Sequence, residues 1–144
     1  MTVSRERVLE TLEWGWGRYV AAYDDLSVEG KSAYLRRQGY QRFADVLAHV
    51  MAWWNEGRLL ITAYVNNPHY KPGERDVDQF NAEAVKAYAD KTEEDFRRAF
   101  EAARRSMIEF VLGLPPDALE SESVMGQLNM EVVGHLAEHT LAEY

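Results

Sequence analysis

The amino-acid sequence predicts an all-α fold, a bundle of four main helices in a single domain that spans residues 1–144. Three observations support this prediction. Apolar residues recur at spacings of three and four, no segment alternates as a strand does, and glycine and proline gather between the periodic segments. A chain of 144 residues can also bury a core of its own without disulfides.

The first helix is predicted over about residues 4–26, with the hydroxyl of Ser4 as its N-cap. Gly15 and Gly17 lie inside this helix, and each costs roughly 1 kcal/mol compared with alanine. Their presence indicates a close approach to another helix or a local irregularity of the backbone. The apolar positions that define the helix are Val8, Leu12, Tyr19, Ala22 and Leu26.

The second helix is predicted over about residues 41–65, after a polar connection through Gly30 and Gly39. Its apolar residues form more than one stripe, so we expect this helix at the centre of the bundle. Residues 66–75 combine two prolines, a glycine and paired asparagines, which predicts a loop. His69 lies in this loop and is expected to be solvated.

The third helical region is predicted as two pieces, because the apolar period is interrupted after residues 76–88. The second piece starts at Thr92, which approximates a capping box with Asp95. It ends at Gly113, which two prolines closely follow.

A looser stretch, residues 117–129, is predicted to precede the last helix, which spans about residues 130–143. One face of this helix carries Val132, His135, His139 and Ala142, at the spacing that an α-helix repeats. The last helix therefore presents two histidines to the interior of the predicted bundle.

Composition excludes several classes of function. The chain has no cysteine, so any thiol chemistry requires a thiol from a substrate. A net charge of −8 and scattered basic residues disfavour nucleic-acid binding. The charged start, MTVSRERVLE, lacks the apolar segment of a signal peptide, and no stretch is long enough to span a bilayer. We expect a cytoplasmic protein without membrane or nucleic-acid partners.

His49, His135 and His139 are candidate ligands of one metal ion. His135 and His139 lie four residues apart in HLAEH, so both imidazoles share one helix face. His49 lies in AHVMAWW, in an apolar helix where a solvated histidine is not expected. Three neutral imidazoles with a water molecule would form an open, catalytic-type metal site. The alternative, that these are hydrogen-bonded core residues, stays open.

Three further residues are candidates for the surroundings of this site. Asp45 and Glu131 lie one helical turn before His49 and His135, where a carboxylate could accept the second ring N–H of each histidine. Trp53 lies one turn beyond His49 and could wall a pocket above the metal. Core packing is the alternative role for Trp53, and surface solvation is the alternative for the two carboxylates.

The segment GYQRFADVLAHVMAWW, residues 39–54, resembles the second-helix signature of the DinB-like superfamily of bacterial four-helix bundles. HLAEH resembles the pair of histidines that closes that superfamily's motif, and residues 77–119 are similar to its ClbS/DfsB branch. The resemblance spans nearly the whole chain. The chain differs in carrying Tyr40-Gln41 where Trp-Ser is common, and Leu136 where the branch often has tyrosine.

The resemblance implies a divalent metal ion, typically zinc or nickel, held by residues that correspond to His49, His135 and His139. It also implies frequent homodimers. Known activities in the superfamily include metal-assisted transfer of low-molecular-weight thiols, such as bacillithiol or mycothiol, to electrophiles. The ClbS branch includes a protein that opens the cyclopropane of a DNA-alkylating natural product, and that branch need not use a metal.

Together these observations favour a metal-dependent enzyme that acts on small electrophilic molecules by thiol transfer or hydrolysis, in detoxification or stress protection. The expected nucleophile is metal-bound water or a substrate thiolate. A non-catalytic protein that sequesters a small molecule, with the metal absent or structural, is the first alternative. The second is a dimeric scaffold whose histidines belong to the core.

Overall fold

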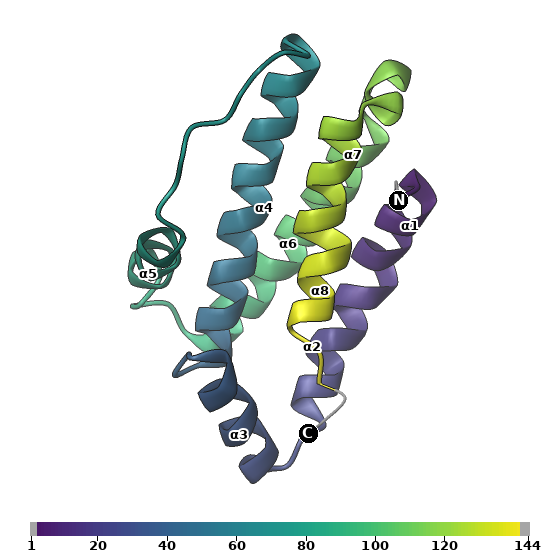
Figure 1. The fold of residues 1–144 in the computed structure, drawn as a ribbon. Helices are drawn as coiled ribbons and strands as arrows, with labels where there is room; N and C mark the ends of the chain where they lie inside the picture. The colour runs from purple at the N-terminus through teal and green to yellow at the C-terminus, as the bar shows by residue number, and fades with distance from the viewer. Residues whose placement is uncertain (1–2, 142–144) are drawn as a thin grey trace.

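The computed structural model describes residues 3–141, which fold almost entirely into helices (Figure 1). No strand occurs within this range, so the all-α prediction is confirmed. The longest helix is α4 (Phe43–Asn66), which packs against α5 (Val77–Ala87), α6 (Glu93–Leu112) and α7 (Glu122–Leu128). Its central place agrees with the apolar residues on more than one of its faces.

The first helical segment is irregular at the glycines. It consists of α1 (Arg5–Glu10), a π-helical stretch η1 (Thr11–Gly15) and α2 (Trp16–Asp24), and the hydroxyl of Ser4 caps it by accepting from the amide of Arg7. A Cβ atom at Gly15 would lie 2.8 Å from the side chain of Leu136, whereas one at Gly17 would meet nothing within 4 Å. Gly15 therefore marks both the irregularity and the close helix approach that the sequence predicts.

Residues 28–38 correct one prediction, because the expected polar connection contains a helix, α3 (Val28–Gln38). Ser27 caps its start by accepting from the amide of Gly30, and Gly39 ends it in the left-handed region at a φ of 84°. The apolar pattern of α3 is weak, with Tyr34 as its buried residue. Its caps define the helix better than its periodicity does.

The last helical segment corrects a second prediction, because it begins at Glu122 rather than at residue 130. It runs from α7 through a π-helical stretch η3 (Asn129–Gly134) into α8 (His135–Glu138), after a short 3₁₀-helix η2 (Pro116–Glu120). Ser121 supplies the N-cap by accepting from the amide of Val124. Residues 142–143 of the predicted helix lie outside the described residues.

Other expected boundaries are confirmed. The loop after α4 and the break between α5 and α6 occur where the sequence predicts them. The hydroxyl of Thr92 accepts from the amide of Asp95, and α6 ends at Gly113.

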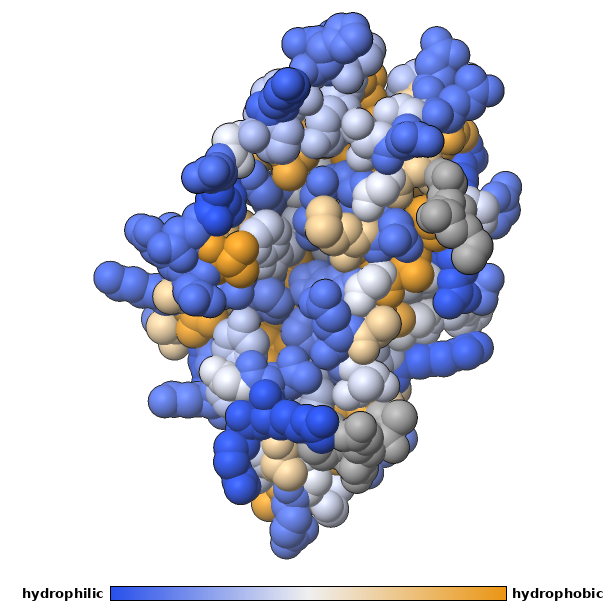
Figure 2. Space-filling model, in the orientation of Figure 1, coloured by the Kyte–Doolittle hydropathy of each residue, from blue (hydrophilic) through white to orange (hydrophobic). Residues whose placement is uncertain are grey.

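On the face seen in Figure 2, apolar residues are scattered among hydrophilic ones. No helix within residues 3–141 is long and apolar enough to cross a membrane.

An aromatic core joins the helical segments beside the histidines. Trp16 is fully buried, and its ring meets those of Trp54, Phe100 and His135 edge-on at centroid distances of 5.3–6.0 Å. The indole N–H of Trp16 donates to the carbonyl of Val132, and that of Trp54 donates to the carbonyl of Glu131. Both carbonyls belong to η3, so two tryptophans hold the π-helical stretch that immediately precedes His135.

Candidate metal centre

The structure brings His49, His135 and His139 together. Each offers one ring nitrogen, and the three nitrogens lie within 4.8 Å of one another. His49 comes from the N-terminal third of α4, His135 starts α8 and His139 follows its last residue. His135 and His139 are only 6% and 4% exposed, and His49 is partly buried. The expected neighbourhood of the second and last helices is therefore confirmed.

The outer ring nitrogens of His49 and His139 have hydrogen-bond acceptors. Nδ1 of His49 lies 2.8 Å from the side-chain oxygen of Asn81, and Nδ1 of His139 lies 2.8 Å from that of Gln38. A histidine that donates one N–H to an acceptor presents a lone pair on its other nitrogen. Asn81 and Gln38 therefore direct the Nε2 lone pairs of His49 and His139 inward.

The inner nitrogens lie close together, and that of His139 has no hydrogen-bond partner among the described residues. Nε2 of His49 and Nε2 of His135 are 3.0 Å apart, and two lone pairs at this distance repel unless a proton or cation lies between them. Nε2 of His139 is buried and has no hydrogen-bond partner among residues 3–141. A tetrahedral ion with three imidazole ligands would need nitrogens about 3.3 Å apart, and the three nitrogens lie within 4.8 Å of one another. The donor set therefore fits a divalent metal.

Burial keeps the triad uncharged near neutral pH. Desolvation lowers the pKa of His135 to about 4 and that of His139 to about 3, and it also lowers the pKa of His49. The proximity of the three rings adds to these shifts for His135 and His139. Neutral imidazoles are the form that binds a metal, so protons would compete little with a cation at pH 7.

The other predicted residues take different places. Asp45 accepts from the backbone amide and the guanidinium of Arg42 at the start of α4, so Asn81 rather than Asp45 supports His49. The Glu131 carboxylate accepts a hydrogen bond from Gln127 instead of from the ring of His135. Sequence reasoning missed Asn81 and Gln38, because neither residue carries a signal beyond being polar on a helix.

A cavity of about 720 Å³ adjoins the triad. His49, His135 and Trp53 form part of its wall. The loop that follows α4 closes one side with residues 70 and 72–75, and the ion pair of Arg75 with Glu56, at 2.6 Å, ties this loop to α4. The remaining lining residues are Leu60, Val77, Asn81, Gln127, Met130, Glu131 and Glu138.

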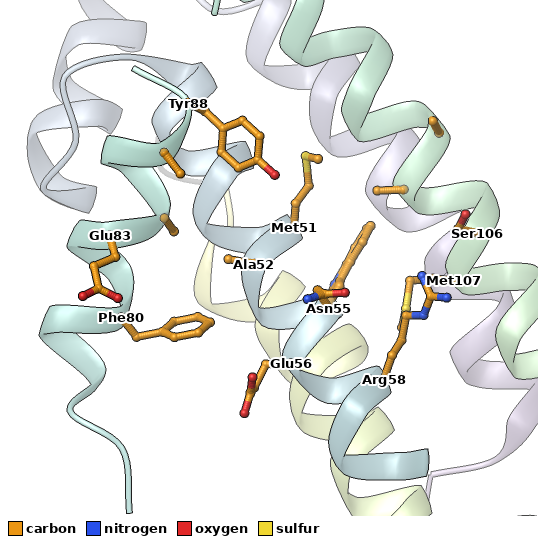
Figure 3. A pocket seen from close by; sticks show the side chains of 15 residues that line it. Met51, Ala52, Asn55, Glu56, Arg58, Phe80, Glu83, Tyr88, Ser106 and Met107 are labelled. Carbon is orange, nitrogen blue, oxygen red and sulfur yellow. The ribbon is translucent and has the colours of Figure 1, made fainter. Parts of the chain in front are cut away.

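A second cavity, of about 520 Å³, lies between α4, α5 and α6 (Figure 3). Met51, Ala52 and Asn55 of α4 face Phe80 of α5 and Met107 of α6 across it. No histidine lines this cavity, and it shares only Glu56 with the cavity beside the triad. The candidate chemistry therefore belongs to the larger cavity.

Glu131 is a buried acid in the wall of the larger cavity. It is 5% exposed, and Gln127 donates a hydrogen bond of 2.8 Å to its carboxylate. A Cβ atom at Gly57 would lie 2.9 Å from the Glu131 side chain, so this glycine makes room for the acid against α4. Desolvation raises the pKa of Glu131 to about 7, and nearby Glu56 and Glu138 add to the shift.

We expect Glu131→Gln to stabilise the metal-free protein at alkaline pH. The folded-state pKa of Glu131 lies above its ordinary value of 4.5, so folding stability is lost as pH rises from 4.5 through about 7. Glutamine cannot ionise and avoids this loss. Chemical denaturation in the presence of a chelator should show a gain in unfolding free energy of about 3 kcal/mol at pH 8 and almost none at pH 4.

The control for this prediction is Glu138→Gln, which removes an exposed carboxylate from the same cavity. Its unfolding free energy should change by less than about 0.5 kcal/mol at both pH values. An equal gain for Glu131→Gln at pH 4 and pH 8 would show that the effect comes from packing rather than ionisation.

No family model matches this chain, and comparison with curated proteins and with solved structures likewise found no match. The functional assignment is therefore carried by the site itself. Its strongest element is the convergence of three ring nitrogens within 4.8 Å, one of them buried without a hydrogen-bond partner among the described residues.

Proposed function

We propose that this chain is a metal-dependent enzyme of the DinB-like four-helix-bundle type, which acts on small electrophilic molecules by thiol transfer or hydrolysis. His49, His135 and His139 would hold a zinc or nickel ion. The observation that carries the proposal is the convergence of three ring nitrogens within 4.8 Å, one of them buried without a hydrogen-bond partner among the described residues, because a divalent cation would bind all three lone pairs. The long helical segments around this site support the bundle assignment.

The adjoining cavity supports a reaction on a bound small molecule. A volume of about 720 Å³ is within the range of small-molecule sites, and two of the proposed ligands open onto it. A divalent ion at the triad would lower the pKa of the attacking water or thiol. Because the chain has no cysteine, a thiol nucleophile would have to enter this cavity from solution.

Residues of the cavity supply the other requirements of such a reaction. The Trp53 indole offers an apolar wall for the substrate, and the Arg75 to Glu56 ion pair keeps the loop over the cavity. The carboxyl group of Glu131, with its pKa raised to about 7, can hold or release a proton at neutral pH. These features favour catalysis over a purely structural role for the histidines.

The test is multiple turnover by protein purified without a histidine tag. We expect zinc- or nickel-loaded protein to conjugate a low-molecular-weight thiol to an electrophile such as 1-chloro-2,4-dinitrobenzene, with many product molecules formed per chain. Chelation should abolish the activity. Stoichiometric protection without turnover, over a panel of thiols and electrophiles, would instead identify the chain as a sequestering protein.

A further inference from the structure

Asn81 links the metal site to the wall of the cavity. Its side-chain oxygen accepts two hydrogen bonds, one of 2.8 Å from Nδ1 of His49 and one of 2.7 Å from the indole N–H of Trp53. We infer that Trp53 and Asn81 are positioning residues that together fix the proton of His49 on Nδ1, so that Nε2 presents a lone pair to the metal. This inference rests on the proposed function.

The inference depends on which group of the Asn81 amide, the oxygen or the NH₂, faces His49. An asparagine side chain can turn over and exchange its oxygen with its NH₂ group. If the NH₂ group faced His49, Nδ1 would have to accept and the proton would move to Nε2. That proton would occupy the position of the metal. The direction of the Asn81 amide therefore decides whether His49 can be a ligand.

The indole N–H of Trp53 determines which group of the Asn81 amide faces it and His49. An indole N–H can only donate, so the atom that faces it must be the oxygen of Asn81. Turning the amide would set two donors against each other and cost about 1–3 kcal/mol. Trp53 is held in place independently, since its ring packs on that of Phe80 at a centroid distance of 4.3 Å. The guanidinium of Arg75 in turn lies over Phe80.

The geometry of α4 places both donors on one acceptor. His49 and Trp53 lie four residues apart on α4, so their side chains leave the same helix face. Asn81 faces them from α5. Without this acceptor, Nε2 of His135 would draw the proton of His49 onto Nε2, because those nitrogens are 3.0 Å apart. The Asn81 oxygen opposes that transfer.

A double-mutant series tests the inference through zinc affinity. We expect Trp53→Phe to weaken zinc binding roughly tenfold, because the amide is then free to turn, and Asn81→Leu to weaken it about 10–100-fold. Asn81→Asp should stay within a few-fold of the wild type, because both carboxylate oxygens accept. For the same reason, Trp53→Phe should have no further effect in the Asn81→Asp background. Gln79→Leu removes an exposed amide from α5 and should leave zinc affinity unchanged.

The protonation of His49 provides a second measurement that needs no metal. Long-range ¹H–¹⁵N NMR spectra of the metal-free protein should show the Nδ1–H form of His49 in the wild type and in Asn81→Asp. The spectra should shift toward the Nε2–H form in Trp53→Phe and Asn81→Leu. A merely structural role of Trp53 would leave the site of protonation unchanged.

Two results would overturn the inference. One is an equal loss of zinc affinity on Trp53→Phe in the wild-type and Asn81→Asp backgrounds, which would mean that Trp53 acts by packing alone. The other is an unchanged His49 tautomer in Asn81→Leu. If the wild type bound no zinc, the proposed function would fail, while the NMR spectra of the metal-free protein would still decide the role of Asn81.

Discussion

Replacing His139 with alanine is expected to abolish stoichiometric binding of zinc or nickel. His139 supplies the buried Nε2 that has no partner within the described residues, and its loss leaves two imidazoles for the ion. We expect the dissociation constant to rise at least about 100-fold, which corresponds to about 2.7 kcal/mol. His49→Ala should have the same effect, because it removes the ligand from α4. Competition with a chromophoric chelator measures both changes.

The matched control is His69→Ala, which removes an exposed histidine from the loop after α4. Its zinc affinity should equal that of the wild type. Circular dichroism of each variant separates loss of the ligand from loss of the fold. Unchanged metal content in folded His49→Ala and His139→Ala proteins would exclude the triad as the metal site and leave the histidines as core residues.

Replacing Trp16 with alanine is expected to lower the free energy of unfolding by about 3–5 kcal/mol, the largest change in stability that we predict. The Trp16 side chain is fully buried, and its loss would leave a large cavity beside Trp54 and Phe100. It would also leave the carbonyl of Val132 without the indole donor that is 3.1 Å away. Denaturation by urea should show the change as a lower midpoint with a similar slope.

Trp14 provides the control for Trp16, since it lies two residues away and is 56% exposed. Trp14→Ala should change the unfolding free energy by no more than about 0.5 kcal/mol. Because Trp16 also contacts the rings of His135 and His139, Trp16→Ala should weaken zinc binding, whereas Trp14→Ala should not. If Trp16→Ala and Trp14→Ala changed the unfolding free energy equally, the stability could not be attributed to the packing of Trp16.

The three histidines were predictable from sequence because their positions follow from local periodicity. The four-residue spacing of His135 and His139 places them on one helix face, and the apolar neighbours of His49 place it in the interior. The cavity wall at Trp53 follows from the same one-turn reasoning. The three ring nitrogens lie within 4.8 Å of one another, as a shared site requires.

The hydrogen-bond partners of the ring nitrogens were not predictable in this way. Asp45 lies one turn from His49, but it is held by Arg42 at the helix start. Asn81 is 32 residues from His49 and Gln38 is 101 residues from His139, so their contacts depend on how α5 and α3 pack. Sequence proximity favoured a carboxylate, whereas the fold supplies two amides.

The two π-helical stretches also differ in whether the sequence predicts them. Gly15 signals a departure from regular helix in the first segment, but nothing comparable announces η3 in the last one. Its backbone is held by indole N–H donors of Trp16 and Trp54, which come from two other helical segments. A π-helical stretch that depends on such distant donors leaves no local pattern.

The sequence by itself determined that this protein is helical, where the loop after α4 and the break between α5 and α6 lie, and which three histidines face the interior. These properties depend on residues within a few positions of one another, through helical periodicity and capping. The tertiary structure decided which nitrogen of His49 and of His139 faces inward, because Asn81 and Gln38 occupy the outer ones. Hydrogen bonds between distant segments form only after the helices have packed, so they determine the protonation of the triad and its fitness for a metal.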